Sequence, residues 1–249
     1  MTLELLICTI DEGIERLKDK FLSPRKDVQY LVSWQYTGEC PQVPDWLCLR
    51  RDVRVVQLAG RGLCRNRNHA FDHAQGDVLK ICDDDERWTD MYFDTILETY
   101  RQHPEYDIVH FQAIGPKKKY PPLFVTSFEI TLRRTSLGSL RFDERFGLGS
   151  EYLCAGEEDV FIHDACRSGL SVHYEPKPIC ETHPQTTGDN WESAILQRSK
   201  GAAFCYTRGP VYACYKAVRE SLGWTLRQGA NPIVMLRNWF WGIKYILHP

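Results

Sequence analysis

Short apolar runs alternate with longer amphipathic runs through the first half of the chain, and this alternation constrains the fold more than any other feature. The runs lie at Leu3–Thr9, Gly13–Leu22, Val28–Trp34, Val53–Ala59, Gly62–Ala74 and Asp77–Cys82. Apolar runs of strand length, separated by amphipathic segments of helix length, are typical of βαβ units. Because such units place their strands side by side in one direction, the pattern predicts an α/β fold with a mostly parallel sheet.

The second half of the chain predicts fewer strands and more helix. In order we expect a helix at 89–103, a strand at Tyr106–Gln112, an apolar segment at Leu123–Leu132, turns at Phe142–Gly149, a helix at 156–168 and a strand at Leu170–Tyr174. Residues 115–122 predict an exposed, mobile loop, because prolines and adjacent lysines oppose regular structure. Two or three helices finish the chain, one opened by a capping sequence at 189–192 and another by Asn231-Pro232.

Size and charge narrow the classes of function. A chain of 249 residues can bury one main domain with appendages, and a formal charge of −2 gives no global basic field for nucleic acid. The ten cysteines form no C-x-x-C pair, which favours reduced thiols. The start of the chain lacks the features of a secretory signal, so we expect a cytoplasmic protein. No apolar stretch has the length of a membrane-spanning helix.

Three consecutive carboxylates, Asp83-Asp84-Asp85, fall where the predicted strand at 77–82 ends. Strand alternation would place Asp83 and Asp85 on one face. Open parallel sheets bind ligands outside the carboxyl ends of their strands, and carboxylates there suit a hard cation such as Mg²⁺ or Mn²⁺. The alternative is an acidic turn that caps the helix beginning near Thr89.

An arginine lies on the apolar face of the helix predicted before this strand. Leu63, Arg67, Ala70 and Ala74 recur at helical spacing, so Arg67 should point toward the sheet. A buried arginine needs an anionic partner. That partner is either one of the aspartates or the diphosphate of a ligand.

Four ordered motifs resemble family 2 glycosyltransferases of the GT-A fold. They are Gly62–Asn68, Gly76–Val78 followed by the Asp triplet as the D-x-D motif, Arg141–Gly149, and Gly156–Phe161 as the E-D motif. The resemblance covers roughly residues 3–185. It implies a catalytic domain at 1–188, made of a nucleotide-sugar-binding part at 1–112 and an acceptor-side part at 113–188, followed by a helical appendage at 189–249.

The resemblance also implies roles for single residues. Asp83 and Asp85 would hold the metal, with Asp83, Asp84 and Arg67 near the nucleotide-sugar. Asp159 would be the general base, with Glu158 as the reserve candidate. The structural alternative is that these acids only favour the first turn of a helix, where the helix dipole attracts negative charge.

The strand ends that frame a nucleotide base depart from the family's usual pattern. Thr9 and Asp11 remain candidates for base or ribose contacts, and Trp34 either stacks on a base or belongs to the core. His183 precedes a proline at a place where related enzymes bring a histidine toward the metal or diphosphate. Lys117–Lys119 either close over the donor or form a solvated charge run.

The last helix is amphipathic. Ile233, Leu236, Phe240, Ile243 and Leu247 share one face, and Trp239, Trp241 and Tyr245 add aromatic rings. Such a helix lies on a membrane surface, packs on the catalytic domain or forms a dimer seam.

Taken with the resemblance, these features predict an inverting, metal-dependent glycosyltransferase. It would use a nucleotide-diphosphate sugar, with UDP as the expected nucleotide, and a glycan or lipid-linked acceptor in bacterial surface-polysaccharide assembly, working in the cytoplasm or on the inner face of the membrane. The alternatives are a sugar-phosphate nucleotidyltransferase and a non-catalytic GT-A scaffold that binds glycans.

Overall fold

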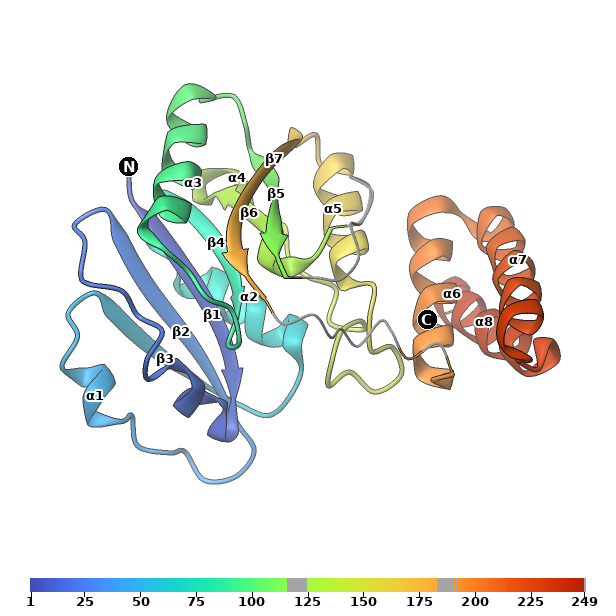
Figure 1. The fold of residues 1–249 in the computed structure, drawn as a ribbon. Helices are drawn as coiled ribbons and strands as arrows, with labels where there is room; N and C mark the ends of the chain where they lie inside the picture. Colours follow the sequence, from blue (N-terminus) through green and yellow to red (C-terminus); the bar gives the residue numbers. More distant parts are fainter. Residues whose placement is uncertain (116–124, 183–189, 191, 249) are drawn as a thin grey trace. The chain divides into compact units, whose positions relative to one another are not determined.

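The computed structural model of the chain describes residues 1–115, 125–182, 190 and 192–248 (Figure 1). Its internal contacts divide it into two compact units. The first comprises Met1–Phe142 with Asp164–Gln185, and the second Asp143–His163 with Thr186–Pro249. The segment 143–163 therefore groups with the C-terminal helices by its contacts. The domain boundary expected at residue 188 stays a prediction.

The first unit is built on a seven-stranded sheet (Figure 1). Its strands are β1 (Leu3–Ile10), β2 (Val28–Tyr36), β3 (Val53–Ala59), β4 (Val78–Asp83), β5 (Ile108–Ile114), β6 (Ile130–Arg133) and β7 (Val172–Glu181). Their order is β3-β2-β1-β4-β6-β5-β7, and only β6 runs antiparallel to its neighbours. The predicted α/β fold with a mostly parallel sheet is confirmed.

The central strands are apolar because both faces of the sheet are covered. Leu3, Leu5 and Ile7 of β1 join one core with helix α3 (Asp90–Gln102). Leu6, between them, is also buried, and helix α2 (Leu63–His73) contacts β1 and β2. Burial on both faces explains why these strands read as continuous apolar runs.

Two connections differ from the sequence expectation. The segment expected as an amphipathic helix at Gly13–Leu22 is a shorter 3₁₀ helix, η1 (Asp11–Leu17). Strand β7 continues past the predicted end at Tyr174 through two prolines. Proline cannot donate a backbone hydrogen bond, but β7 is an edge strand with β5 as its one neighbour in the sheet order, so the missing donors cost little.

Short elements complete the first unit: α1 (Asp45–Cys48), η2 (Ser127–Glu129) and α4 (Arg134–Leu137). Helix α5 (Glu157–Arg167) begins within the second unit and ends within the first.

The second unit contains three long helices, α6 (Ala194–Arg208), α7 (Pro210–Gln228) and α8 (Pro232–Leu247), which contact one another. Phe146, Leu153 and Val160 share a core with Ala202 and Ala203 of α6. That core explains why the turns at 143–156 group with the helices.

The starts of these helices test the predicted caps. Asn231 caps α8 and Pro232 is its first residue, as expected. Helix α6 instead begins at Ala194, where the Ser193 side chain accepts the backbone N–H of Leu196. The capping sequence expected at 189–192 is therefore not the start of the helix, and Asp189 itself lies outside the described residues.

Candidate functional site

The Asp triplet lies at the carboxyl end of β4, the position predicted for it. Strand β4 ends at Asp83, and Asp84 and Asp85 form a turn. We expected strand alternation to put Asp83 and Asp85 on one face. That expectation is wrong, because the strand ends at Asp83 and does not continue to Asp85. The Asp85 side chain is exposed, and no other described residue donates a hydrogen bond to its carboxylate or forms an ion pair with it.

A fourth acid, Glu86, supports this turn from inside the protein. Its side chain is fully buried, and one carboxylate oxygen accepts the backbone N–H of Asp83 at 2.6 Å. The other oxygen lies 2.5 Å from Nζ of the equally buried Lys80 and accepts the indole N–H of Trp88 at 3.1 Å. Although burial opposes a charge on Lys80, its acidic neighbours Cys82 and Glu86 hold the Lys80 pKa above its usual value. The buried ion pair thus fixes the backbone from which Asp83 projects.

Asp84 is held by groups from β1 and η1. Its carboxylate accepts the Thr9 hydroxyl at 2.7 Å and pairs with Arg16 at 2.9 Å. The Lys20 ammonium donates to the backbone carbonyls of Asp84 and Glu86 at 2.6 and 2.9 Å. A Cβ atom on Gly13 would lie 2.6 Å from the Asp84 carboxylate and still closer to the Thr9 hydroxyl, so a larger residue here would displace one of these side chains. Asp84 therefore mainly stabilises the turn, because its oxygens already have hydrogen-bond and ion-pair partners within the protein.

Arg67 reaches Asp83 from α2. Its guanidinium lies 3.2 Å from the Asp83 carboxylate and donates to the Ser127 hydroxyl at 2.6 Å. The side chain is almost completely buried and lies over the Phe142 ring. The ion pair with an aspartate, one of the two predicted partners, is present.

The residues on either side of Arg67 tie α2 to other segments. The Asn66 amide donates to the carbonyls of Thr9 and Ser33, both at 3.0 Å, and so joins the carboxyl ends of β1 and β2. Asn68 exchanges two hydrogen bonds with the backbone of Phe142, at 2.9 and 2.8 Å. One turn of helix therefore positions two strand ends, the acidic turn and the segment that follows β6.

Asp11 directly follows β1 in the left-handed region, with φ of 48°. Aspartate tolerates this region better than most residues because its short side chain forms local hydrogen bonds. Here the carboxylate accepts the backbone N–H of Thr37 at 2.8 Å. The buried Trp34 ring donates its N–H to the Asp11 carbonyl at 2.9 Å, so Trp34 belongs to the core, the second of its two predicted alternatives.

The candidate general base lies in the second unit and is described there on its own. Glu157, Glu158 and Asp159 form the first turn of α5. Burial, with a smaller contribution from the Glu158 charge, raises the pKa of Asp159 to about 6. A carboxylate whose pKa is near the working pH is a more effective proton acceptor than an ordinary aspartate.

Other predicted site residues do not enter this geometry. His183 and Lys117–Lys119 lie outside the described residues. Within the described ranges, no three His, Cys, Asp or Glu side chains gather as a ready-made cation site. A divalent cation here would take one or two carboxylate ligands and complete its shell with donor oxygens and water. The exposed, unpaired Asp85 and the adjacent Asp83 fit that role.

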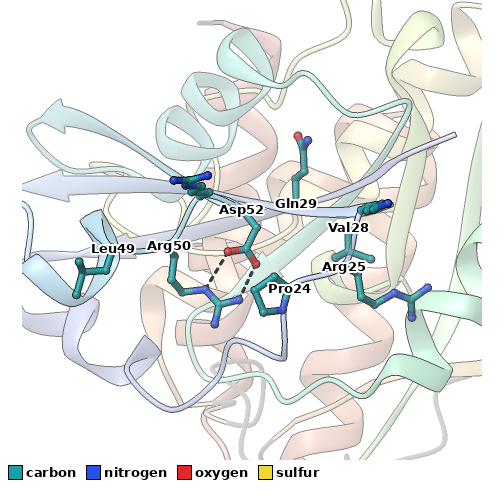
Figure 2. A pocket seen from close by; sticks show the side chains of 9 residues that line it. Pro24, Arg25, Val28, Gln29, Leu49, Arg50 and Asp52 are labelled. Atoms are coloured by element: carbon teal, nitrogen blue, oxygen red, sulfur yellow. Dashed lines mark hydrogen bonds and ion pairs between the residues drawn. The ribbon is translucent and has the colours of Figure 1, made fainter.

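A hollow of about 490 Å³ lies at the amino ends of β2 and β3, opposite the carboxyl ends where the Asp triplet lies (Figure 2). It is lined by residues that precede or begin β2 and β3, among them Val28 and Asp52. Its two half-buried arginines are already paired, Arg50 with Asp52 and Arg25 with Asp27. Because the strand ends there are amino ends, the hollow is not the predicted donor site.

Comparison with known proteins supports the predicted family. The model for glycosyl transferase family 2 matches residues 41–153. That range includes Arg67 and the Asp triplet, and it ends before Glu158 and Asp159. No curated protein matches the chain.

Solved structures of similar fold include TarS and a mannosyltransferase. TarS of S. aureus aligns with a TM-score of 0.57 at 14% identity over 90% of this chain, which spans 44% of that chain. TarS 1–349 in complex with UDP-GlcNAc gives 0.58 at 13% identity, covering 92% of this chain and 76% of that one. The mannosyltransferase PcManGT from Pyrobaculum calidifontis, in complex with GDP-Man and Mn²⁺, gives 0.58 at 12% identity, covering 99% and 87%. At these identities the likeness shows the GT-A fold.

Proposed function

We propose that this chain, whose residues 41–153 match the model for glycosyl transferase family 2, transfers a sugar from a nucleotide diphosphate to a hydroxyl of a glycan or lipid-linked acceptor. The observation that carries the proposal is the turn Asp83–Asp85. It projects from the carboxyl end of a parallel strand, where open α/β sheets bind nucleotides. Glu86 fixes its backbone, and Arg67 pairs with the Asp83 carboxylate.

Binding of the nucleotide-sugar donor is proposed from the negative charge of the Asp triplet. Asp83 and Asp85 would hold Mn²⁺ or Mg²⁺, which would neutralise the leaving diphosphate. Thr9 and Asp11 end the neighbouring strand and are the candidates for contacts with the nucleoside. The similar structures hold UDP-GlcNAc or GDP-Man with Mn²⁺, which supports a nucleotide sugar as donor here, and we favour UDP.

The transfer half rests on Asp159. The acceptor oxygen forms the new bond to the anomeric carbon as the bond to the diphosphate breaks, and the acceptor proton passes to the Asp159 carboxylate. Attack from the face opposite the leaving group inverts the anomeric centre. The pKa of about 6 keeps Asp159 mostly ionised at neutral pH and still basic enough to accept a proton.

Donor binding is tested by thermal shift with UDP, GDP and their sugars, each with and without Mn²⁺. We expect a metal-dependent stabilisation that Asp85→Asn removes. Asp45→Asn is the control, because Asp45 is an exposed acid on α1. Failure of every nucleotide to bind the wild-type chain would overturn the proposal and leave a non-catalytic scaffold.

Turnover is tested with Asp159→Asn, which should bind the donor normally and lose transfer. Near-normal transfer would exclude Asp159 as the base and point to Glu158. Release of pyrophosphate from a sugar phosphate and a nucleoside triphosphate would instead identify a nucleotidyltransferase.

A further inference from the structure

The outer side of α7 carries an apolar stripe that no described residue of the second unit covers. Its members are Val211, Tyr215, Val218, Leu222 and Leu226. Val211 and Leu226 are 85% and 88% exposed, high values for aliphatic side chains. Spacings of four, three, four and four residues place all five on one side of the helix. Contiguous exposed apolar surface of this kind marks an interaction site.

The stripe is distinct from the side of α7 that packs within the unit. Ala213, Ala217 and Ser221 are fully buried, and at 100° per residue their side lies about 140° around the helix from the stripe. The helix therefore uses small residues for its internal contacts and keeps its large apolar residues outside. Packing within the second unit does not account for the stripe.

Helix α8 also exposes apolar residues on its outer side, but there they alternate with basic residues. Its inner side, with Trp239, Gly242 and Ile243, is buried, so the predicted apolar face divides between a packed and an exposed part. On its outer side Ile233, Phe240 and Leu247 are exposed and alternate with the exposed cations Arg237 and Lys244. Long basic side chains between apolar residues can keep their charge in the headgroup layer of a bilayer.

The net charge of α7 and α8 indicates what kind of surface binds the apolar stripe. Residues 210–248 contain five basic side chains and one acidic side chain, and that acid, Glu220, is paired with Lys216. The unpaired cations are complementary to anionic lipid headgroups. A second copy of the chain would bring the same positive charge against this surface, which disfavours a dimer there. Tyr212 and Tyr215, both exposed on α7, have the amphipathic rings that favour a membrane interface.

We propose that the outer sides of α7 and α8 bind an anionic lipid surface in its plane. Within the described residues no helix has the length and apolarity needed to cross a bilayer, so the contact is peripheral. This inference does not depend on which sugar is transferred or on whether transfer occurs.

The test is co-sedimentation of the full chain with vesicles of phosphatidylglycerol and phosphatidylcholine, compared with phosphatidylcholine alone. We expect binding to the anionic vesicles that weakens in high salt. Leu222→Glu and Leu226→Glu should each lower the partition coefficient at least about tenfold, because each removes a leucine that lipid would bury. Arg237→Gln with Lys244→Gln should weaken binding only to anionic vesicles.

Met91→Glu is the matched control, since it alters an exposed apolar residue on α3, in the other unit. It should bind as the wild type does. The inference is overturned if the wild type ignores anionic vesicles, binds neutral ones equally well, or forms a dimer in light scattering that Leu222→Glu dissociates. Circular dichroism of each variant confirms that the helices remain, so lost binding is not lost folding.

Discussion

Replacing Lys80 by methionine should destabilise the first unit and loosen the acidic turn. Lys80 and Glu86 are both fully buried, and their charged atoms lie 2.5 Å apart. Methionine keeps the length of the side chain but leaves the Glu86 carboxylate without its cation. Removing one partner of a buried ion pair typically costs about 3–5 kcal/mol. In a chain of this size that corresponds to a decrease of about 6–20 °C in melting temperature.

The remaining contacts of Glu86 decide what the double variant does. With Lys80→Met and Glu86→Gln together no charge is buried, and the single glutamine oxygen can accept one of the two N–H groups, of Asp83 or Trp88, that the two carboxylate oxygens now accept. Replacing both partners by neutral groups of similar shape is often close to neutral in stability. Because one of these N–H groups loses its acceptor, we expect the double variant to regain part of the lost stability.

The assays are thermal unfolding of the full chain and binding of UDP with Mn²⁺. Lys216→Met is the control, because it breaks a pair of similar chemistry, Lys216 with Glu220 at 3.1 Å, on an exposed helix where such pairs contribute about 0.5 kcal/mol. The reasoning is refuted if Lys80→Met melts within about 2 °C of the wild type, or if the double variant is less stable than the single one.

Three further predictions concern other parts of the molecule. Asn66→Asp should cost about 2–3 kcal/mol, because it sets a carboxylate against two strand carbonyls, and Asn66→Ala should cost less in chemical denaturation. Transfer should fall about tenfold per pH unit below pH 6, where Asp159 is protonated, and a flat rate profile from pH 5 to 7 would exclude Asp159 as the base. Gly242→Ala should destabilise the helical unit by about 1–3 kcal/mol, because its Cβ would meet the Arg198 carbonyl, whereas Gly223→Ala should not, since it meets only the flexible end of Arg227.

The parts of the site predicted from sequence are those set by periodicity. Strand length and the position of the Asp triplet follow from the apolar run before it, and helical spacing indicates that Arg67 faces the sheet. The outcome for Asp85 was not predictable in this way, because alternation holds only while a strand continues. The chain turns after Asp83, where the Asp83 N–H is bound by Glu86 instead of a neighbouring strand.

The buried pair of Glu86 and Lys80 is not identified in the sequence analysis. Glu86 extends an acidic run that looks exposed, and Lys80 lies in a strand that is otherwise apolar. A lone lysine in a strand buried on both faces was the available signal, since such a charge requires an acid nearby. The lengths of η1 and β7 depend on tertiary context that no local pattern contains. The role proposed for Asp159 comes from family resemblance, and its raised pKa only from the folded unit.

The three consecutive residues Asn66, Arg67 and Asn68 have a consequence for protein engineering. Each bonds to a different segment, so a change in the pitch or position of this helical turn would displace the strand ends, the Asp83 carboxylate and the Phe142 segment together. Libraries intended to alter donor preference should therefore leave this turn unchanged and vary residues that contact only the ligand. Substitutions in this turn would yield mostly misfolded variants and few with a new donor specificity.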